Sequence, residues 1–137
     1  MAELIAEIGI NHQGNLKKVF AMIDQINQSG TRSVKLQYRS DKSFFDAALE
    51  MGSTIVAQEL EGSNLNLSEN LDALSYIKKN GMLAGVSFFR LVDVKEFCGH
   101  IIPDFFKIPS AEALNFDLIK YCQQFKRPVI VSTGGLN

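Results

Sequence analysis

Five short apolar runs alternate along the chain with longer stretches of helical periodicity. The runs are nearly continuous and rich in β-branched or aromatic residues, which is typical of strands buried on both faces of a sheet. They cover residues 4–8, 33–37, 83–88, 105–108 and 129–132. The alternation of such runs with helical stretches indicates repeated βα units and predicts an α/β fold with a parallel sheet.

Four stretches between these runs predict helices. They cover residues 15–29 with a stop at Gly30, a stretch from Ser68 as N-cap to Gly81, residues 92–98, and a stretch beginning after Asn115 as N-cap. One connection is unusually long, because residues 38–67 comprise about thirty residues with two short helical patches. Loops of this length are usually functional, and this one could serve as a lid or as a dimer contact.

Composition restricts the possible functions. A hydrophobic content of 46% and a charged content of 21% are those of one soluble globular unit. The net charge of -1 gives no overall attraction to nucleic acid or to an anionic membrane, so any anion must be bound by a local site.

The cysteines and the apolar runs indicate the compartment. Cys98 and Cys122 do not have the spacing of zinc ligands or of a redox motif, so we expect both to be reduced thiols. With no secretion signal or membrane-length apolar run, we expect a cytoplasmic location.

Each apolar run ends in polar residues. In a parallel barrel the active site is built at the C-terminal ends of the strands, so these residues are candidates for one site. They are Glu7, Lys35, Gln37, Ser87, Lys107, Ser110 and Ser132, the last followed by Thr133, Gly134 and Gly135. Charged groups inside a barrel are costly unless they are paired or meet a ligand. Convergence of Glu7, Lys35 and Lys107 would offset their charges and leave cationic capacity for an anion, and lysines with hydroxyls and a glycine turn would suit a phosphate.

No single element of this set is specific. A lone strand lysine is often a salt-bridge residue, and Ser-Thr-Gly-Gly is a common turn, so it is the recurrence at successive strand ends that favours a site. Glu7 could be a structural partner of a lysine, or an acid, base or hydroxyl acceptor. For His12 we favour a hydrogen bond within its loop over a metal ligand, and we expect His100 to be solvated.

Four motifs, taken in order and spacing, resemble the N-acetylneuraminate (sialic acid) synthase family. They are Ala-Glu-Ile-Gly-Ile-Asn-His at 6–12, Val-Lys-Leu-Gln at 34–37, Phe-Lys-Ile-Pro-Ser at 106–110 and Val-Ser-Thr-Gly-Gly at 131–135. The resemblance implies a (β/α)8 TIM barrel, of which this chain carries about the first five strands and four helices. Residues 1–137 would then be the N-terminal part of the synthase domain, with the remaining strands and a C-terminal antifreeze-like domain outside it.

The resemblance also implies a reaction. The family condenses phosphoenolpyruvate with an open-chain N-acetylated hexose, such as N-acetylmannosamine, to give a nine-carbon 2-keto sugar acid and phosphate. Its divalent metal, Mn or Mg, would polarise the sugar aldehyde as a Lewis acid. Glu7 and Gln37 would face the reacting centre, and the phosphoenolpyruvate would be held by Lys35, Ser87, Lys107, Ser110 and Ser132. We expect the metal ligands to lie outside this chain, the chain alone to be inactive, and the protein to be a homo-oligomer.

Two departures from the family pattern leave the sugar undecided. After Ser87 the chain has lost a proline and carries Arg90 in place of an acid, and Gly135 stands where methionine is common. Two other functions also remain open. One is a Schiff-base aldolase on the same barrel, with Lys35 or Lys107 as nucleophile. The other is a non-catalytic binding or assembly module in which the half barrel pairs its first and fifth strands with another chain.

Overall fold

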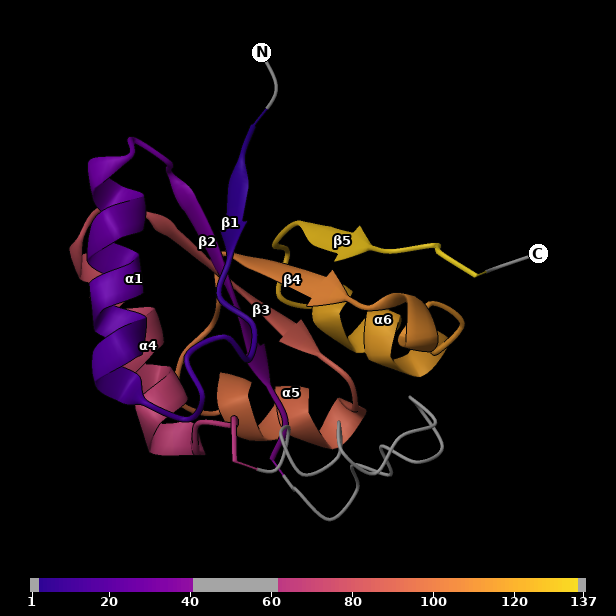
Figure 1. Cartoon of the computed structure of the whole chain (residues 1–137). Helices are drawn as coiled ribbons and strands as arrows, with labels where there is room; N and C mark the ends of the chain where they lie inside the picture. Colours follow the sequence, from indigo (N-terminus) through magenta and orange to yellow (C-terminus); the bar gives the residue numbers. More distant parts are fainter. Residues whose placement is uncertain (1–2, 41–61, 136–137) are drawn as a thin grey trace.

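The computed structural model describes residues 3–40 and 62–135. Strands and helices alternate along the chain, as the sequence predicts (Figure 1). The elements are β1 (Ile5–Glu7), α1 (Leu16–Gln28), β2 (Ser33–Tyr38), α4 (Leu67–Lys79), β3 (Leu83–Phe88), α5 (Leu91–Cys98), β4 (Phe105–Ile108), the 3-10 helix η2 (Ser110–Glu112), α6 (Phe116–Gln123) and β5 (Val129–Val131). Within the two described ranges no helix is long and apolar enough to cross a membrane.

The strands form one parallel sheet in the order β1-β2-β3-β4-β5. The sheet is curled into part of a barrel, with helices packed along its outer side (Figure 1). Paired residues of neighbouring parallel strands point to the same face, and the register pairs Glu7 with Lys35, Gln37 with Ser87, and Ser87 with Lys107. The predicted polar strand ends therefore share the inner face. The predicted TIM-barrel class, incomplete in this chain, is confirmed.

The hydrophobic core lies between the sheet and the helices. Alternate strand residues, such as Val34, Val86 and Phe106, are fully buried there. Aromatic rings join the layers, since Phe88 of β3 lies edge-on to Phe97 of α5 with ring centroids 5.5 Å apart. Because one face of each strand supplies this core, the other face is free to carry the polar residues of a site.

Most element boundaries agree with the sequence within a residue or two. Asn115 caps α6 as predicted, accepting a hydrogen bond from the Leu118 backbone. The predicted cap of α4 at Ser68 is wrong. Asn66 caps this helix, and Asn66 and Glu69 bond each other's backbone reciprocally as a capping box. The prediction of two helical patches in the long connection concerns residues that fall largely within 41–61, outside the described residues.

Candidate anion site at the strand ends

Lys35 is the buried centre of a network that joins three strands. Its side chain is only 8% exposed. The ammonium donates to Glu7 Oε1 at 2.7 Å and to Ser87 Oγ at 2.8 Å. Since β2 lies between β1 and β3, a lysine at this position reaches partners on both sides. The network offsets part of the cost of burying the Lys35 charge.

Glu7 is held through one of its two carboxylate oxygens. Besides Lys35, the Gln37 amide donates to Glu7 Oε1 at 3.0 Å. Gly9 leaves space for that amide, because a Cβ at position 9 would lie 3.3 Å from Gln37 Nε2. Burial alone would raise the pKa of Glu7, but hydrogen bonds from Lys35 and Gln37 and the nearby positive charges outweigh it, and the pKa is lowered. Glu7 is therefore ionised, and within the described residues its Oε2 accepts no hydrogen bond.

Lys107 carries the charge that the site leaves uncompensated. Its ammonium donates to Ser132 Oγ at 2.6 Å and to the Ile108 carbonyl at 2.9 Å. Within residues 3–40 and 62–135 it has no carboxylate partner in salt-bridge range. Burial lowers the pKa of Lys107, the positive charge of Lys35 lowers it further, and Glu7 raises it. A second negative charge on a ligand would stabilise the protonated form.

Ser110 lies close to the turn after β5, whose Ser132 accepts the hydrogen bond from Lys107. Ser110 begins η2 directly after β4, and a Cβ at Gly134 would lie 3.9 Å from the Ser110 Cβ. Gly135 has φ +78°, a conformation that favours glycine. The structure thus brings all seven predicted site residues to one edge of the sheet. Two ammonium groups face one carboxylate there, with hydroxyls between them, and this charge balance suits an anion.

Comparison with known proteins identifies the family. The NeuB family model matches residues 22–137. The chain belongs to the NeuB family. It is 30% identical over 96% of its length to the spore coat polysaccharide biosynthesis protein SpsE of Bacillus subtilis, and 28% identical over 96% to an N,N'-diacetyllegionaminic acid synthase of Legionella pneumophila. The chain spans 37% and 39% of these two relatives, respectively.

Solved structures agree with this assignment. The crystal structure of the Bacillus subtilis SpsE protein matches with a TM-score of 0.73 at 28% identity, covering 97% of this chain and 36% of that one. The N-acetylneuraminic acid (sialic acid) synthetase of Leptospira borgpetersenii serovar Hardjo-bovis, solved with citrate, matches with a TM-score of 0.77 at 23% identity, covering 97% and 45%. The second likeness concerns the fold alone, and the resemblance to the sialic acid synthase family seen in the motifs is confirmed.

His12 has the structural role favoured from the sequence. It is 6% exposed, and its Nδ1 accepts a hydrogen bond from the Gly14 backbone at 3.0 Å. Burial lowers its pKa, which favours the neutral ring that this bond requires. His100 is exposed, as expected. Within the described parts of this NeuB-family chain, no three His, Cys, Asp or Glu residues are placed to hold a metal ion.

Sequence reasoning missed a buried carboxylate in α5. Asp93 in the first turn of α5 is 0% exposed. It accepts hydrogen bonds from the Ser40 backbone at 3.2 Å, from the Ser40 hydroxyl, and from Arg90 Nη2 at 3.0 Å. Arg90, noted only as a departure from the family pattern, thus pairs with a buried acid. The spacing of Arg90 and Asp93 suits such a pair, but the sequence gives no sign that Asp93 is buried.

Proposed function

We propose that this chain supplies the phosphoenolpyruvate site of a NeuB-family synthase. In the whole protein, C3 of phosphoenolpyruvate forms a bond to the aldehyde carbon of an open-chain N-acetylated hexose of the N-acetylmannosamine type, whose oxygen takes up a proton. Water adds at C2, and the C2–O bond to phosphate then breaks. The products are a nine-carbon 2-keto sugar acid and phosphate, which makes the enzyme a C–C bond-forming transferase.

The observation that carries this proposal is the positive charge of Lys107, which has no carboxylate partner among the described residues. Its ammonium is oriented by Ser132 on one side and by the Ile108 carbonyl on the other. Lys35, already neutralised by Glu7, presents a second cation on the same face. Phosphoenolpyruvate carries a phosphate and a carboxylate, so two cations on one face, with the Ser87, Ser110 and Ser132 hydroxyls beside them, match its two anionic ends.

Glu7 and Gln37 would serve the reacting centre next to this anion. Gln37 and Lys35 fix Glu7 through Oε1, which leaves Oε2 to accept a hydrogen bond from a sugar hydroxyl or from the attacking water. Holding the two substrates in a fixed orientation is the larger part of the catalysis. Glu7 stays ionised in this role because its pKa is lowered.

The described residues do not by themselves fit a metal site, since no three metal-ligating side chains converge there. We propose that the divalent ion, Mn or Mg, takes its ligands from outside this chain. We also propose that the protein is cytoplasmic and homo-oligomeric, and that this chain alone is inactive.

Calorimetric titration of phosphoenolpyruvate into the purified chain tests the anion site. Lys107→Ala should weaken binding by at least about tenfold, because it removes a charge-assisted contact. Lys79→Ala is the matched control, since Lys79 is an exposed lysine in the last turn of α4, next to the start of β3 and not at the C-terminal strand ends. Equal affinity in the wild type and Lys107→Ala would contradict the proposal, as would the absence of binding to the folded wild-type chain.

The lowered pKa of Lys107 also favours a second candidate, a Schiff-base aldolase. Burial and the charge of Lys35 both promote the neutral amine that attacks a carbonyl. Borohydride treatment in the presence of pyruvate distinguishes the two functions. A covalent adduct on Lys107 or Lys35, seen by mass spectrometry, would favour the aldolase. An unmodified chain that still binds phosphoenolpyruvate would favour the synthase.

A further inference from the structure

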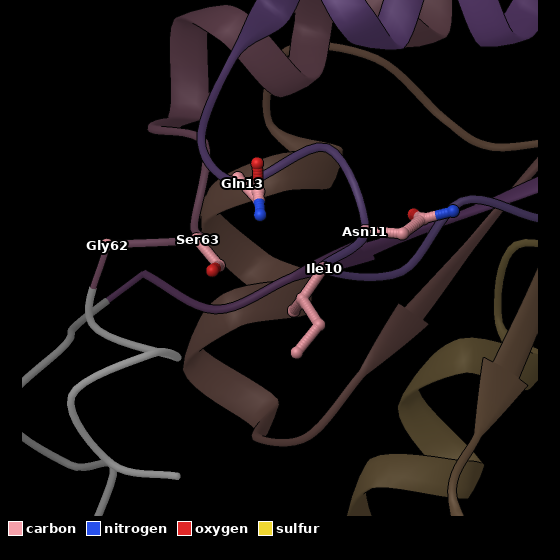
Figure 2. A pocket seen from close by; sticks show the side chains of 5 residues that line it. All are labelled: Ile10, Asn11, Gln13, Gly62 and Ser63. Carbon is pink, nitrogen blue, oxygen red and sulfur yellow. The ribbon is translucent and has the colours of Figure 1, made fainter. Parts of the chain in front are cut away.

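A cavity of about 470 Å³ lies between the loop after β1 and the segment before α4. It is lined by Ile10, Asn11, Gln13, Gly62 and Ser63 (Figure 2). The Asn11 amide points away from the Gln13 and Ser63 side chains, so the lining does not converge on one ligand. The feature that bears on the anion site lies instead on the inner face of the sheet, one row of residues below the strand ends.

The strand register arranges the inner face of the sheet in rows. One row is paired in turn across β1, β2, β3 and β4 and consists of Glu7, Lys35, Gly85 and Phe105. The next row toward the C-terminal strand ends contains Gln37, Ser87 and Lys107. The ion pair of Lys35 and Glu7 therefore shares its row with an aromatic residue, and Lys107 lies in the row above.

Phe105 leans across β3 because position 85 has no side chain. A Cβ built on Gly85 would lie 2.2 Å from Phe105 Cζ and 2.5 Å from Phe105 Cδ2, so the ring covers Gly85 itself. On the other side of Gly85 the row continues with Lys35, and neighbouring strands are about 4.8 Å apart. Phe105 is buried but is not part of the core cluster between the sheet and the helices, to which Phe106 belongs. Its ring therefore fills the inside of the curled sheet.

The ring restricts the directions open to the Lys35 ammonium. Within its own row Lys35 has the Glu7 carboxylate on one side, at 2.7 Å, and the Phe105 ring over Gly85 on the other. Its second hydrogen bond goes to Ser87 Oγ in the next row, at 2.8 Å. The ammonium thus points toward the strand ends. An apolar ring below Lys107 also excludes water there, and charges attract each other more strongly where water is excluded.

We propose that Phe105 is a positioning residue of the anion site. Its ring, seated on Gly85, closes the inner face below the site, directs the Lys35 ammonium toward the strand ends and keeps water from the base of Lys107. Phe105 acts through these two lysines and does not touch the ligand. This inference rests on the proposed function and adds that the anion site depends on an apolar residue outside the polar strand ends.

The pKa of Lys107 reports whether the ring has this role. Among the described residues, burial lowers this pKa, the charge of Lys35 on β2 lowers it further, and Glu7 on β1 raises it. Removal of the ring admits water, so the pKa of Lys107 should rise toward its ordinary value of 10.5. The affinity for phosphoenolpyruvate should then fall at neutral pH, while its decline at alkaline pH should begin at a higher pH.

Three variants of the purified chain test the proposal. Phe105→Leu removes the ring from the inner face. Phe97→Leu is the matched control, because it makes the same substitution at a fully buried position in the core between sheet and helices. The exchange variant Gly85→Phe with Phe105→Ala places the ring on β3 instead of β4. Calorimetry measures the affinity for phosphoenolpyruvate, and nuclear magnetic resonance of the lysine Cε signals, assigned with Lys107→Ala, gives the pKa of Lys107.

We expect Phe105→Leu to weaken binding at least about fivefold and to raise the pKa of Lys107. Phe97→Leu should lower the unfolding midpoint and leave both quantities unchanged. The exchange variant should bind within about threefold of the wild type, and it keeps the proposal testable if Phe105→Leu does not fold. Equal affinity and an equal Lys107 pKa in folded Phe105→Leu and the wild type would overturn the proposal. So would a folded exchange variant that has lost binding.

The same measurements separate this inference from the proposed function. If phosphoenolpyruvate binds through Lys107 and Phe105→Leu changes neither affinity nor pKa, the positioning role fails and the synthase proposal stands. If Phe105→Leu raises the pKa of Lys107 but the wild type does not bind phosphoenolpyruvate, the effect of the ring on the lysine is retained and the proposed phosphoenolpyruvate site fails.

Discussion

The ring of Phe105 occupies the space above Gly85 on the inner face of the sheet. The two residues are paired in the register of β3 and β4. A Cβ at position 85 would lie 2.1 Å from Phe105 Cε2, far inside van der Waals contact. Phe105 is 5% exposed and lies two residues before Lys107 on the same face. The missing side chain at 85 thus lets an aromatic ring pack directly below the anion site.

Gly85→Ala should destabilise the fold by about 1–3 kcal/mol, since the added methyl forces the ring or a strand to move. Urea denaturation measures the change. Gly62→Ala is the control, because a Cβ there meets nothing within 4 Å and the backbone is not in the left-handed region. Combining Gly85→Ala with Phe105→Leu should recover part of the loss. Equal unfolding midpoints for Gly85→Ala and the wild type would contradict the packing.

Binding of phosphoenolpyruvate should weaken as the pH rises through the lowered pKa of Lys107. Burial and the charge of Lys35 place this pKa below its ordinary value of 10.5. Only the protonated amine attracts the anion, so affinity is full below the lowered pKa and declines above it. Lys107→Arg stays charged at every accessible pH and should bind with little pH dependence in this range. Calorimetry at a series of alkaline pH values checks this, and parallel declines for both proteins would refute it.

The strands, the polar residues at their ends and the family can all be predicted from the sequence. Continuous apolar runs define buried parallel strands, and their period places Glu7, Lys35 and Lys107 on the inner face once the sheet is assembled. Contacts that depend on the exact positions of side chains in space cannot be predicted from the sequence. The sequence does not reveal that Phe105 fills the space over Gly85, or that Asp93 is buried. At the start of α4 the prediction of Ser68 as N-cap is wrong, because Asn66 is an equally good N-cap and has capping-box spacing to Glu69.

Replacement of Glu7 by Gln should alter the acid stability of the fold. The pKa of Glu7 is lowered in the folded chain, so its ionised form contributes stability at pH values above its unfolded value of 4.5. That contribution is lost as the pH falls through the lowered pKa. The wild type should therefore lose more stability than Glu7→Gln on acidification in this window. Denaturation curves at stepped pH values measure the difference, and an identical pH dependence would show that the Lys35 pair does not lower the pKa of Glu7.

Arg90 and Asp93 should behave as a coupled pair. Arg90→Ala would leave the fully buried Asp93 carboxylate with Ser40 as its hydrogen-bond donor among the described residues, at a cost of about 2–4 kcal/mol in the free energy of unfolding. Asp93→Ala removes the carboxylate that accepts hydrogen bonds from both Ser40 and Arg90, but Arg90 also donates to Ser40 Oγ at 3.0 Å and, being 29% exposed, can bond to water. The double variant should then lose less than the sum of the single variants, by about 1–3 kcal/mol. Additive losses in the double-mutant cycle would mean that Arg90 does not compensate the buried acid, and that Ser40 and the start of α5 suffice to hold Asp93 in place.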